Sequence, residues 1–410
     1  MLPVAPAPAP RSSSALGWGA YLACSWTWCI GMFLPVLLVR DYGILGFVAF
    51  AVPNILGAAS VGWVITREWQ AEAILKSHAR AVGWFSLITR SFQLFFLLWL
   101  SLSASGTFAQ RASIVGSMLV LCFGAAAVAV LARRKTAAAT GLWFASAGIA
   151  AALWFRGSLS TAWFGIERLL PTTSPQELLW LAPVCAFGFL LCPYLDGTFL
   201  SVRALSSADR ARAAFTFGFC VLFPVMILFT LAYAGWMLPI DGLGTLAAAG
   251  SISAILVLAH IAMQLGFTFG LHTQVGVFPL YRVPQSWSRL ATIAATAGGV
   301  IGGTATLTYA GLSVGEVAYR MFMAFYGLVF PAYVWICVIP TPDGHTGPSG
   351  PKIRIWALAV GVAAPMFWMG FIERQTWWLA PGLGIVLLAR LAVRHGLKKP
   401  VSAAADPSIA

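Results

Sequence analysis

Charged residues are scarce in this chain: Asp, Glu, Lys and Arg together make up 9% of its 410 residues. Soluble domains carry roughly 25%, so the composition excludes an ordinary soluble domain. Acidic residues are the scarcest, 12 against 25 basic ones, which leaves a formal net charge of +13. Apolar residues are abundant instead, at 60% of the chain. The sequence therefore predicts an all-α polytopic membrane protein.

Motifs typical of soluble catalysis are missing as well. The chain has no Walker loop, no GxSxG, no HExxH and no paired carboxylates. Its seven cysteines lie in apolar segments, without the spacing of a metal site or a disulfide framework. We therefore expect no enzyme activity, no catalytic residue, no confident metal site and no nucleic-acid partner. The expected partners are a small-molecule substrate and the lipid bilayer.

Twelve apolar segments have roughly the 20 residues that a membrane-spanning helix needs. Charges and turn residues separate them. The predicted spans are 16–39, 42–66, 83–105, 112–132, 137–155, 178–202, 213–238, 250–272, 288–311, 318–340, 353–372 and 376–394.

Lysine and arginine alternate between the loops that join these spans. If the N-terminus is cytoplasmic, the inner loops hold 18 of the 25 basic residues and the outer loops six, with Arg90 inside the third span. Basic residues accumulate in cytoplasmic loops. The pattern predicts a multi-pass inner-membrane protein with both termini in the cytoplasm, and loose tails at 1–14 and 395–410.

Two spans carry helix-breaking residues near their middle. The first contains Gly31 and Pro35, and the sixth contains Pro193 and Gly197. A proline frees the carbonyl four residues earlier, and in lipid that carbonyl needs a partner or a wet cavity. Interrupted helices in corresponding positions of two halves indicate a transporter site, which we expect between 29–35 and 189–197.

The second and seventh spans also correspond to each other, because each contains a proline: Pro53 in the second and Pro224 in the seventh. Five spans separate the partners, and the charge pattern gives them opposite orientations. We therefore predict an inverted repeat of 15–155 and 178–340, followed by two additional helices over 353–394. Ordinary proline kinks are the alternative explanation, since the tenth and eleventh spans have them too.

Two stretches carry a family resemblance: "WTWCIGMFLPVLLVRDYGILGFVAFAVPNILGAASVGWV" and "AVGWFSLITRSFQLFFLLWL". They resemble the first three helices of sodium:solute symporters and their relatives in the amino acid-polyamine-organocation superfamily, which share the leucine-transporter fold. The resemblance implies a 5+5 inverted repeat with discontinuous helices 1 and 6, and secondary transport. The eighth span departs from the family because it lacks an adjacent Ser/Thr pair, so sodium coupling is not implied.

Asp196 is the most informative single residue. It is the only charge between Glu177 and Arg203, and a charge at mid-membrane costs about 3 kcal/mol on insertion scales. With the unwound backbone around it, a carboxylate suits a cation, a proton or an amine. The alternative is that Asp196 reaches cytoplasmic water and pairs with Arg203.

Other polar and aromatic residues complete the predicted site. His260 could relay a proton, because the reference pKa of histidine is near neutrality; the alternative is a neutral core histidine with one hydrogen bond. Since Asp196 and His260 are both titratable residue types and the Ser/Thr pair is missing, a proton is a slightly better prediction for the coupling ion than sodium. The aromatic residues could stack on an organic solute, or anchor the helices at the interface. The predicted substrate- and ion-binding residues are Asp196, Pro193, Tyr194, Phe189, Trp26, Trp28, Cys29, Gly31, Thr268, Gln264 and His260, and a sodium ion would lie near the Gly31 carbonyl and Thr268.

These patterns favour one function. We expect a secondary active transporter that moves a small organic solute by alternating access, coupled to a proton or sodium gradient. We expect no cofactor apart from Na+ or H+ as the coupling ion. The alternative is a non-transporting membrane sensor, or a membrane-embedded enzyme subunit, built on the same scaffold.

Overall fold

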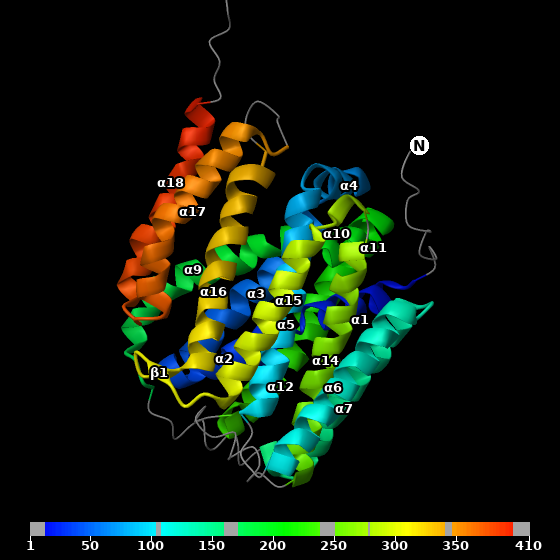
Figure 1. Cartoon of the computed structure of the whole chain (residues 1–410). Coiled ribbons are helices and arrows are strands. Elements are labelled where there is room, and N and C mark those ends of the chain that lie inside the picture. The colour runs from blue at the N-terminus through cyan, green and yellow to red at the C-terminus, as the bar shows by residue number, and fades with distance from the viewer. Residues whose placement is uncertain are drawn as a thin grey trace, which may run out of the picture.

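The computed structural model describes residues 13–103, 108–159, 171–237, 251–277, 279–340 and 347–396. Within these residues the chain forms a bundle of helices with one two-stranded β-hairpin (Figure 1). The prediction of an all-α polytopic membrane protein is confirmed at this level. The predicted tails fall mostly outside the described residues, although the Ser14 hydroxyl accepts a hydrogen bond from the Gly17 amide and so caps the first helix.

The N-terminal half contains two broken spans and one short connecting helix. Its elements are α1 (Ala15–Trp26), α2 (Cys29–Tyr42), α3 (Ile44–Val64), α4 (Glu68–Ser77), α5 (Ala79–Leu102), α6 (Phe108–Leu131), α7 (Lys135–Phe155), η1 (Pro175–Glu177), α9 (Leu178–Leu191), η2 (Cys192–Leu195) and α10 (Gly197–Leu205).

The C-terminal half adds long helices, two of which contain a π-helical turn. Its elements are α11 (Ala208–Phe217), η3 (Gly218–Leu222), α12 (Phe223–Met237), α14 (Ser251–Val277), η4 (Pro279–Tyr281), α15 (Gln285–Thr304), β1 (Thr308–Tyr309), β2 (Leu312–Ser313), α16 (Val314–Tyr333), η5 (Val334–Val338), α17 (Gly350–Phe371), η6 (Thr376–Trp378) and α18 (Leu379–Gly396).

Ten helical segments of the described chain are long and apolar enough to cross a membrane, and α1 with α2 makes an eleventh if a broken helix counts as one span. Each of the predicted ranges overlaps a helix, but α15 is not among these segments. The count of twelve spans therefore stays a prediction. Large apolar side chains such as Leu131, 77% exposed, and Leu358, 69% exposed, face outward, as lipid contact requires.

The predicted ninth span, 288–311, is wrong at its C-terminal end. Helix α15 ends at Thr304, and the β-hairpin follows. Its two-residue turn consists of Ala310, with φ 51°, and Gly311, with φ 74°. Two consecutive positive φ angles are typical of a type I′ turn, which apolar composition alone does not reveal.

The two ends of the bundle differ, and we name them the hairpin end, which carries β1 and β2, and the α4 end. In Figure 1, α17 and α18 lie at one edge of the bundle beside α16, and α6 and α7 lie at the opposite edge. The central helices α2, α5, α14 and α16 lie between these edges and contribute much of the buried core. The charge pattern predicts that the hairpin end is outside the cell.

Glycines of α15 allow two helices to pack closely, as their small-xxx-small spacing predicts. A Cβ atom built at Gly299 would lie 2.7 Å from the Phe95 carbonyl oxygen, and one at Gly303 would lie 2.5 Å from Cβ of Leu102. Any side chain would push α15 away from α5. The predicted packing role of these glycines is confirmed.

Candidate functional site

The first span is interrupted at its middle, where the axes of α1 and α2 differ by 58°. Helix α1 ends at Trp26, and Trp28 has an extended backbone, with φ −123° and ψ −171°, before α2 begins at Cys29. The Thr27 hydroxyl donates to the Ala23 carbonyl at 2.8 Å. A side chain that bonds to nearby backbone competes with helix continuation, which explains the position of this break.

The predicted place of this break, 29–35, is therefore wrong. Gly31 and Pro35 both lie inside α2, which runs through the proline to Tyr42. Pro35 leaves the carbonyl of Gly31 without its helical amide partner, and two tyrosine hydroxyls contact carbonyls near it in α2. The Tyr319 hydroxyl donates to the carbonyl of Cys29 at 3.1 Å, and the Tyr233 hydroxyl donates to that of Met32 at 2.8 Å.

The sixth span is interrupted within the predicted range. Helix α9 gives way to the 3₁₀ turn η2, Asp196 adopts an extended backbone, and α10 begins at Gly197. One carboxylate oxygen of Asp196, Oδ1, accepts hydrogen bonds from the amide and from the hydroxyl of Thr198, both at 2.7 Å. The charge and the break share one turn because the carboxylate caps the half-helix that the break creates.

The second oxygen of Asp196 has a different environment. Oδ2 is buried and has no hydrogen-bond partner among the described residues. Nε2 of His272 lies 3.9 Å from it, and Nδ1 of His272 lies 3.2 Å from the Ser86 hydroxyl. Both Asp196 and His272 are 1% exposed. A buried carboxylate oxygen without a partner requires a proton, a water or a cation.

The alternative interpretation of Asp196 is wrong. The carboxylate does not reach water, and Arg203 does not pair with it. The guanidinium of Arg203 donates instead to the carbonyls of Ile65 and Ser206. Arg203 therefore holds the C-terminal ends of α3 and α10 together, and it does not neutralise Asp196.

Aromatic residues join the two interruptions. The rings of Trp26 and Phe199 have centroids 5.0 Å apart, and those of Trp28 and Tyr326 have centroids 5.5 Å apart. The thiol of Cys192, in η2, lies 3.6 Å from the Tyr326 carbonyl oxygen. Tyr326 of α16 thus contacts both breaks, and its hydroxyl has no partner among the described residues.

The two tryptophans are core residues, because each is only 2% exposed. Their alternative role as interface anchors is therefore wrong. The indole N–H of Trp26 donates to Oδ1 of Asn54 at 2.6 Å. This bond fixes the ring beside Phe199 and ties α1 to α3.

Three predicted residues form a second polar cluster, in which α14 faces α1 and α7. The Thr268 hydroxyl lies 3.2 Å from the carbonyl oxygen of Cys24 and 3.1 Å from that of Gln264. The Gln264 amide donates to the Ser146 hydroxyl at 3.0 Å, and Nδ1 of His260 lies 2.9 Å from the same hydroxyl. His260 is thus a hydrogen-bonded core histidine, and His272 is the imidazole beside Asp196.

The remaining predicted residues lie apart or have other neighbours. The carbonyl that contacts Thr268 is that of Cys24, not that of Gly31. The Tyr194 hydroxyl lies 3.2 Å from the Ser60 hydroxyl and lines a separate cavity of about 610 Å³ near α4. Within the described residues no three His, Cys, Asp or Glu side chains converge as metal ligands.

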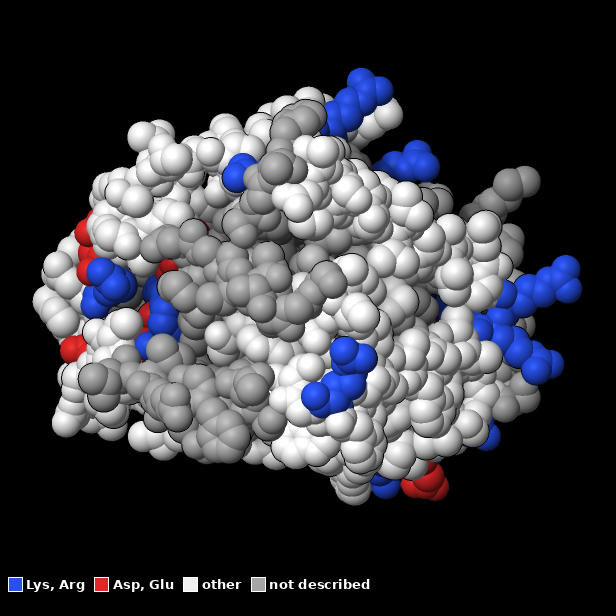
Figure 2. All heavy atoms as spheres, turned by 90° about the horizontal axis from the view of Figure 1, so that it is seen from below, with Lys and Arg blue, Asp and Glu red and all other residues white. Residues whose placement is uncertain are grey.

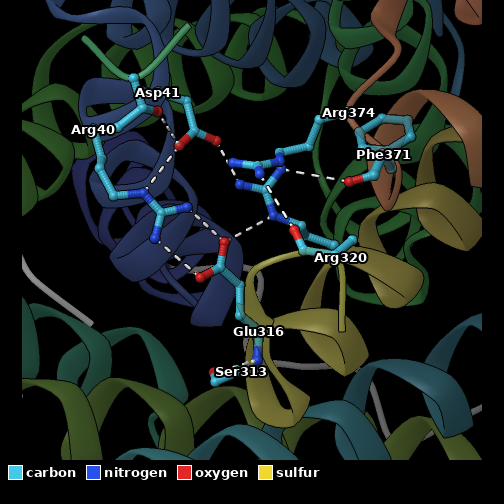
Figure 3. Close-up of polar contacts among 9 residues, drawn as sticks. Arg40, Asp41, Ser313, Glu316, Arg320, Phe371 and Arg374 are labelled. Atoms are coloured by element: carbon cyan, nitrogen blue, oxygen red, sulfur yellow. Dashed lines mark hydrogen bonds and ion pairs between the residues drawn. The ribbon is translucent and has the colours of Figure 1, made fainter. Parts of the chain in front are cut away.

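A cluster of four charges at the hairpin end was not predicted as part of the site; Figure 3 shows it, and we call it the outer network. Arg40 donates to both oxygens of Glu316, at 2.9 and 2.5 Å, and to Asp41 at 2.9 Å. Arg320 donates to Glu316 at 2.8 Å and to Asp41 at 2.5 Å. The network joins α2 to α16, and none of its side chains is more than 18% exposed.

The outer network lies over a small cavity of about 60 Å³. Asp41 and Arg320 line it toward the hairpin end, and Phe189 and Tyr326 line it toward the interruptions. A cavity needs only roughly 10–15 Å³ of such space to admit one water molecule, so this cavity is large enough for water. Viewed from the hairpin end, most of the visible acidic side chains lie beside basic ones on one side of the face, and further basic side chains are scattered over the rest (Figure 2).

The sequence contains a pattern that indicates the outer network, although the predicted topology places the two arginines of the network in loops. Arg40 and Asp41 are adjacent at the end of one span, and Glu316 and Arg320 are four residues apart at the start of another. A spacing of four places both side chains on one helix face. Equal numbers of opposite charges at the same predicted end of two spans indicate an interhelical network.

No protein-family model matches the chain, and a comparison with curated proteins gives no match. The family resemblance of the first three helices thus stays an expectation.

Proposed function

We propose that the protein is a secondary active transporter that moves a small organic solute across the membrane by alternating access. One observation supports this proposal: two interrupted helices meet beside the buried Asp196, and one carboxylate oxygen of Asp196 has no hydrogen-bond partner among the described residues. Interrupted backbone in a membrane is tolerated where it is buried in protein or lines a cavity, and discontinuous helices form the substrate sites of many transporters.

The described arrangement fits an occluded state. The outer network closes the hairpin end, and the contact between Trp26 and Phe199 closes the space toward the α4 end. The cavity under the outer network measures only about 60 Å³, so an organic solute would need further space to form around the interruptions. Entry from the hairpin end therefore requires α2 and α16 to separate.

We further propose a proton as the coupling ion, held by Asp196 and His272. The two groups lie 3.9 Å apart in a buried site, and a proton added to either one would create a hydrogen-bonded pair. The rings of Trp28 and Tyr326 beside them suit an organic solute that is neutral, zwitterionic or cationic.

Uptake into proteoliposomes tests both proposals. Purified protein is reconstituted, a proton or a sodium gradient is imposed, and accumulation is measured for a panel of radiolabelled amino acids, nucleobases, sugars and amines. We expect the proton gradient to drive accumulation of at least one solute, and Asp196→Asn to reduce it at least about tenfold, the effect of losing about 1.4 kcal/mol of interaction. Asp209→Asn is the matched control, because the Asp209 side chain is 97% exposed.

The outcomes separate the two parts of the proposal. If sodium alone drives uptake, transport stands and the assignment of a proton is wrong. If neither gradient drives any solute of the panel, the transport proposal fails and the sensor or enzyme-subunit alternative is favoured.

A further inference from the structure

A second polar cavity, of about 330 Å³, lies at the α4 end of the bundle. It is enclosed by α5, the end of α14, the turn η4 and the start of α15. No acidic residue of the described chain lines it, in contrast to the cavity under the outer network. Its lining residues are Gly83, Leu87, Arg90, Gly276, Tyr281, Arg282, Val283, Gln285 and Ser288.

Arg90 places a positive charge in the wall of this cavity. It is a half-buried residue of the third span, and its Nη2 donates to the Ser288 hydroxyl at 2.7 Å. No carboxylate of the described residues lies within ion-pair distance of its guanidinium. A half-buried cation without a counter-ion attracts an anion, so an anion in the cavity would stabilise Arg90.

Two other features add positive potential at the same place. Arg282 lies in the cavity wall, and α15 begins there at Gln285. The residue before α15 is Pro284, which offers no side-chain cap to the first amides of a 20-residue helix. Uncapped amides and the positive end of the helix dipole favour an anion.

The level of this cavity relative to the membrane indicates the source of its ligand. The rings of Trp84 and Trp287 have centroids 5.9 Å apart, and Trp287 is 52% exposed. Tryptophans gather at the level of lipid headgroups, and basic pockets between helices on the cytoplasmic side bind anionic headgroups. The α4 end is the predicted cytoplasmic end.

We propose that this cavity binds a phosphate group, supplied by the headgroup of an anionic phospholipid or by free phosphate. Arg90 and Arg282 would contact the phosphate oxygens as guanidinium groups do, with parallel N–H bonds, and the Ser288 hydroxyl would add a further donor. The residues that line this site do not form the interruptions themselves, so phosphate binding and solute uptake are measured separately.

Two binding arms test the proposal and separate the sources. The first measures the thermal unfolding midpoint of purified protein in neutral detergent with inorganic phosphate or with chloride at equal ionic strength. The second measures the retention of phosphatidylglycerol by native mass spectrometry after reconstitution in phosphatidylcholine bilayers with and without that lipid. The variants are Arg90→Gln and Arg282→Gln, and the matched control is Arg289→Gln, an exposed arginine of α15 outside the cavity.

We expect wild type and Arg289→Gln to bind in at least one arm, and Arg90→Gln to bind at least about tenfold more weakly, as loss of a charged hydrogen-bonding group predicts. Retention of lipid alone assigns the site to a headgroup, and a midpoint raised by phosphate assigns it to free phosphate. If Arg90→Gln does not fold, Arg282→Gln must bind several-fold more weakly. The proposal is overturned if neither probe binds, or if the cavity variants bind as well as Arg289→Gln.

Discussion

At the scale of single residues, Asp196 uses its two carboxylate oxygens differently. Oδ1 caps α10 through Thr198, and Oδ2 lies near His272 without a hydrogen bond. A cap needs an acceptor oxygen but no charge, so asparagine can replace aspartate in that role. The capping role and the charge of Asp196 can therefore be separated by substitution.

We expect Asp196→Ala to lower the free energy of unfolding by about 1 kcal/mol, because it removes the cap. Asp196→Asn should change it by less than about 0.5 kcal/mol, since its amide oxygen still accepts from the Thr198 amide. Unfolding in mixed detergent, followed by circular dichroism, measures both. Equal losses in the two variants would show that the charge itself holds α10 in place.

The sequence predicted Asp196 because a lone charge in an apolar segment is visible without any structure. It did not predict His272 as its neighbour, because α14 brings that imidazole from 76 positions along the chain. His260 and His272 look alike in sequence, each lying in the same apolar span. Only the packing of α14 against α5 and α10 distinguishes the core histidine from the one beside the carboxylate.

At the scale of helices, close contacts between backbones organise the bundle. A Cβ atom built at Gly57 of α3 would lie 2.1 Å from the Phe189 carbonyl oxygen of α9. This contact sets the distance between the second span and the interrupted sixth span. The Gly124 position in α6 has no atom within 4 Å of such a Cβ atom, and thus imposes no spacing.

Gly57→Ala should therefore destabilise the protein by about 1–3 kcal/mol, as overpacking does. Gly124→Ala should be neutral or stabilise by up to about 1 kcal/mol, because alanine is the better helix former. Thermal unfolding midpoints of the two variants in one detergent provide the comparison. A Gly57→Ala midpoint equal to that of Gly124→Ala would contradict the close contact between α3 and α9.

The two interruptions show what sequence predicts about helices and what it does not. Pro193 and Gly197 indicated the break in the sixth span correctly, because a proline and a glycine there flank a residue that can cap the next helix. Pro35 misled the prediction for the first span. Helix α2 runs through this proline, and the span breaks earlier, at Thr27 and Trp28, where the Thr27 hydroxyl bonds to the Ala23 carbonyl.

At the scale of the whole molecule, the outer network holds together parts that are distant in sequence. It joins the ends of α2 and α16, and Arg320 also donates to the carbonyl of Phe371 in α17 at 3.5 Å. The loop before α9 is attached as well, because the Thr173 amide donates to the Asp41 carbonyl at 2.9 Å. Opening at the hairpin end must break this network.

We expect Glu316→Gln to open the hairpin end more often. It leaves two arginines with one carboxylate, and removal of one partner from a buried ion pair costs about 3–5 kcal/mol. Cys185 reports the change, because this half-buried thiol lines the cavity below the outer network. A membrane-impermeant maleimide applied at the hairpin end should label Cys185 at least several-fold faster than in wild type.

Glu373→Gln is the control for this experiment. Glu373 lies at the same end and accepts a hydrogen bond from the Tyr309 hydroxyl at 2.6 Å, outside the outer network. This bond also raises the pKa of Tyr309. Equal labelling of Cys185 in both variants would show that the outer network does not close the cavity.

The outer network contains two guanidinium groups and two carboxylates, so its formal charge is zero. An elementary charge that crosses the full membrane potential changes the free energy by about 2.3 kcal/mol per 100 mV. If α2 and α16 separate, Arg40 and Asp41 move with α2 while Glu316 and Arg320 move with α16, and each pair carries no net formal charge through that field. In the proposed transport cycle, voltage would then act on the solute and its coupling ion, and the hairpin end would open equally well in energised and de-energised cells.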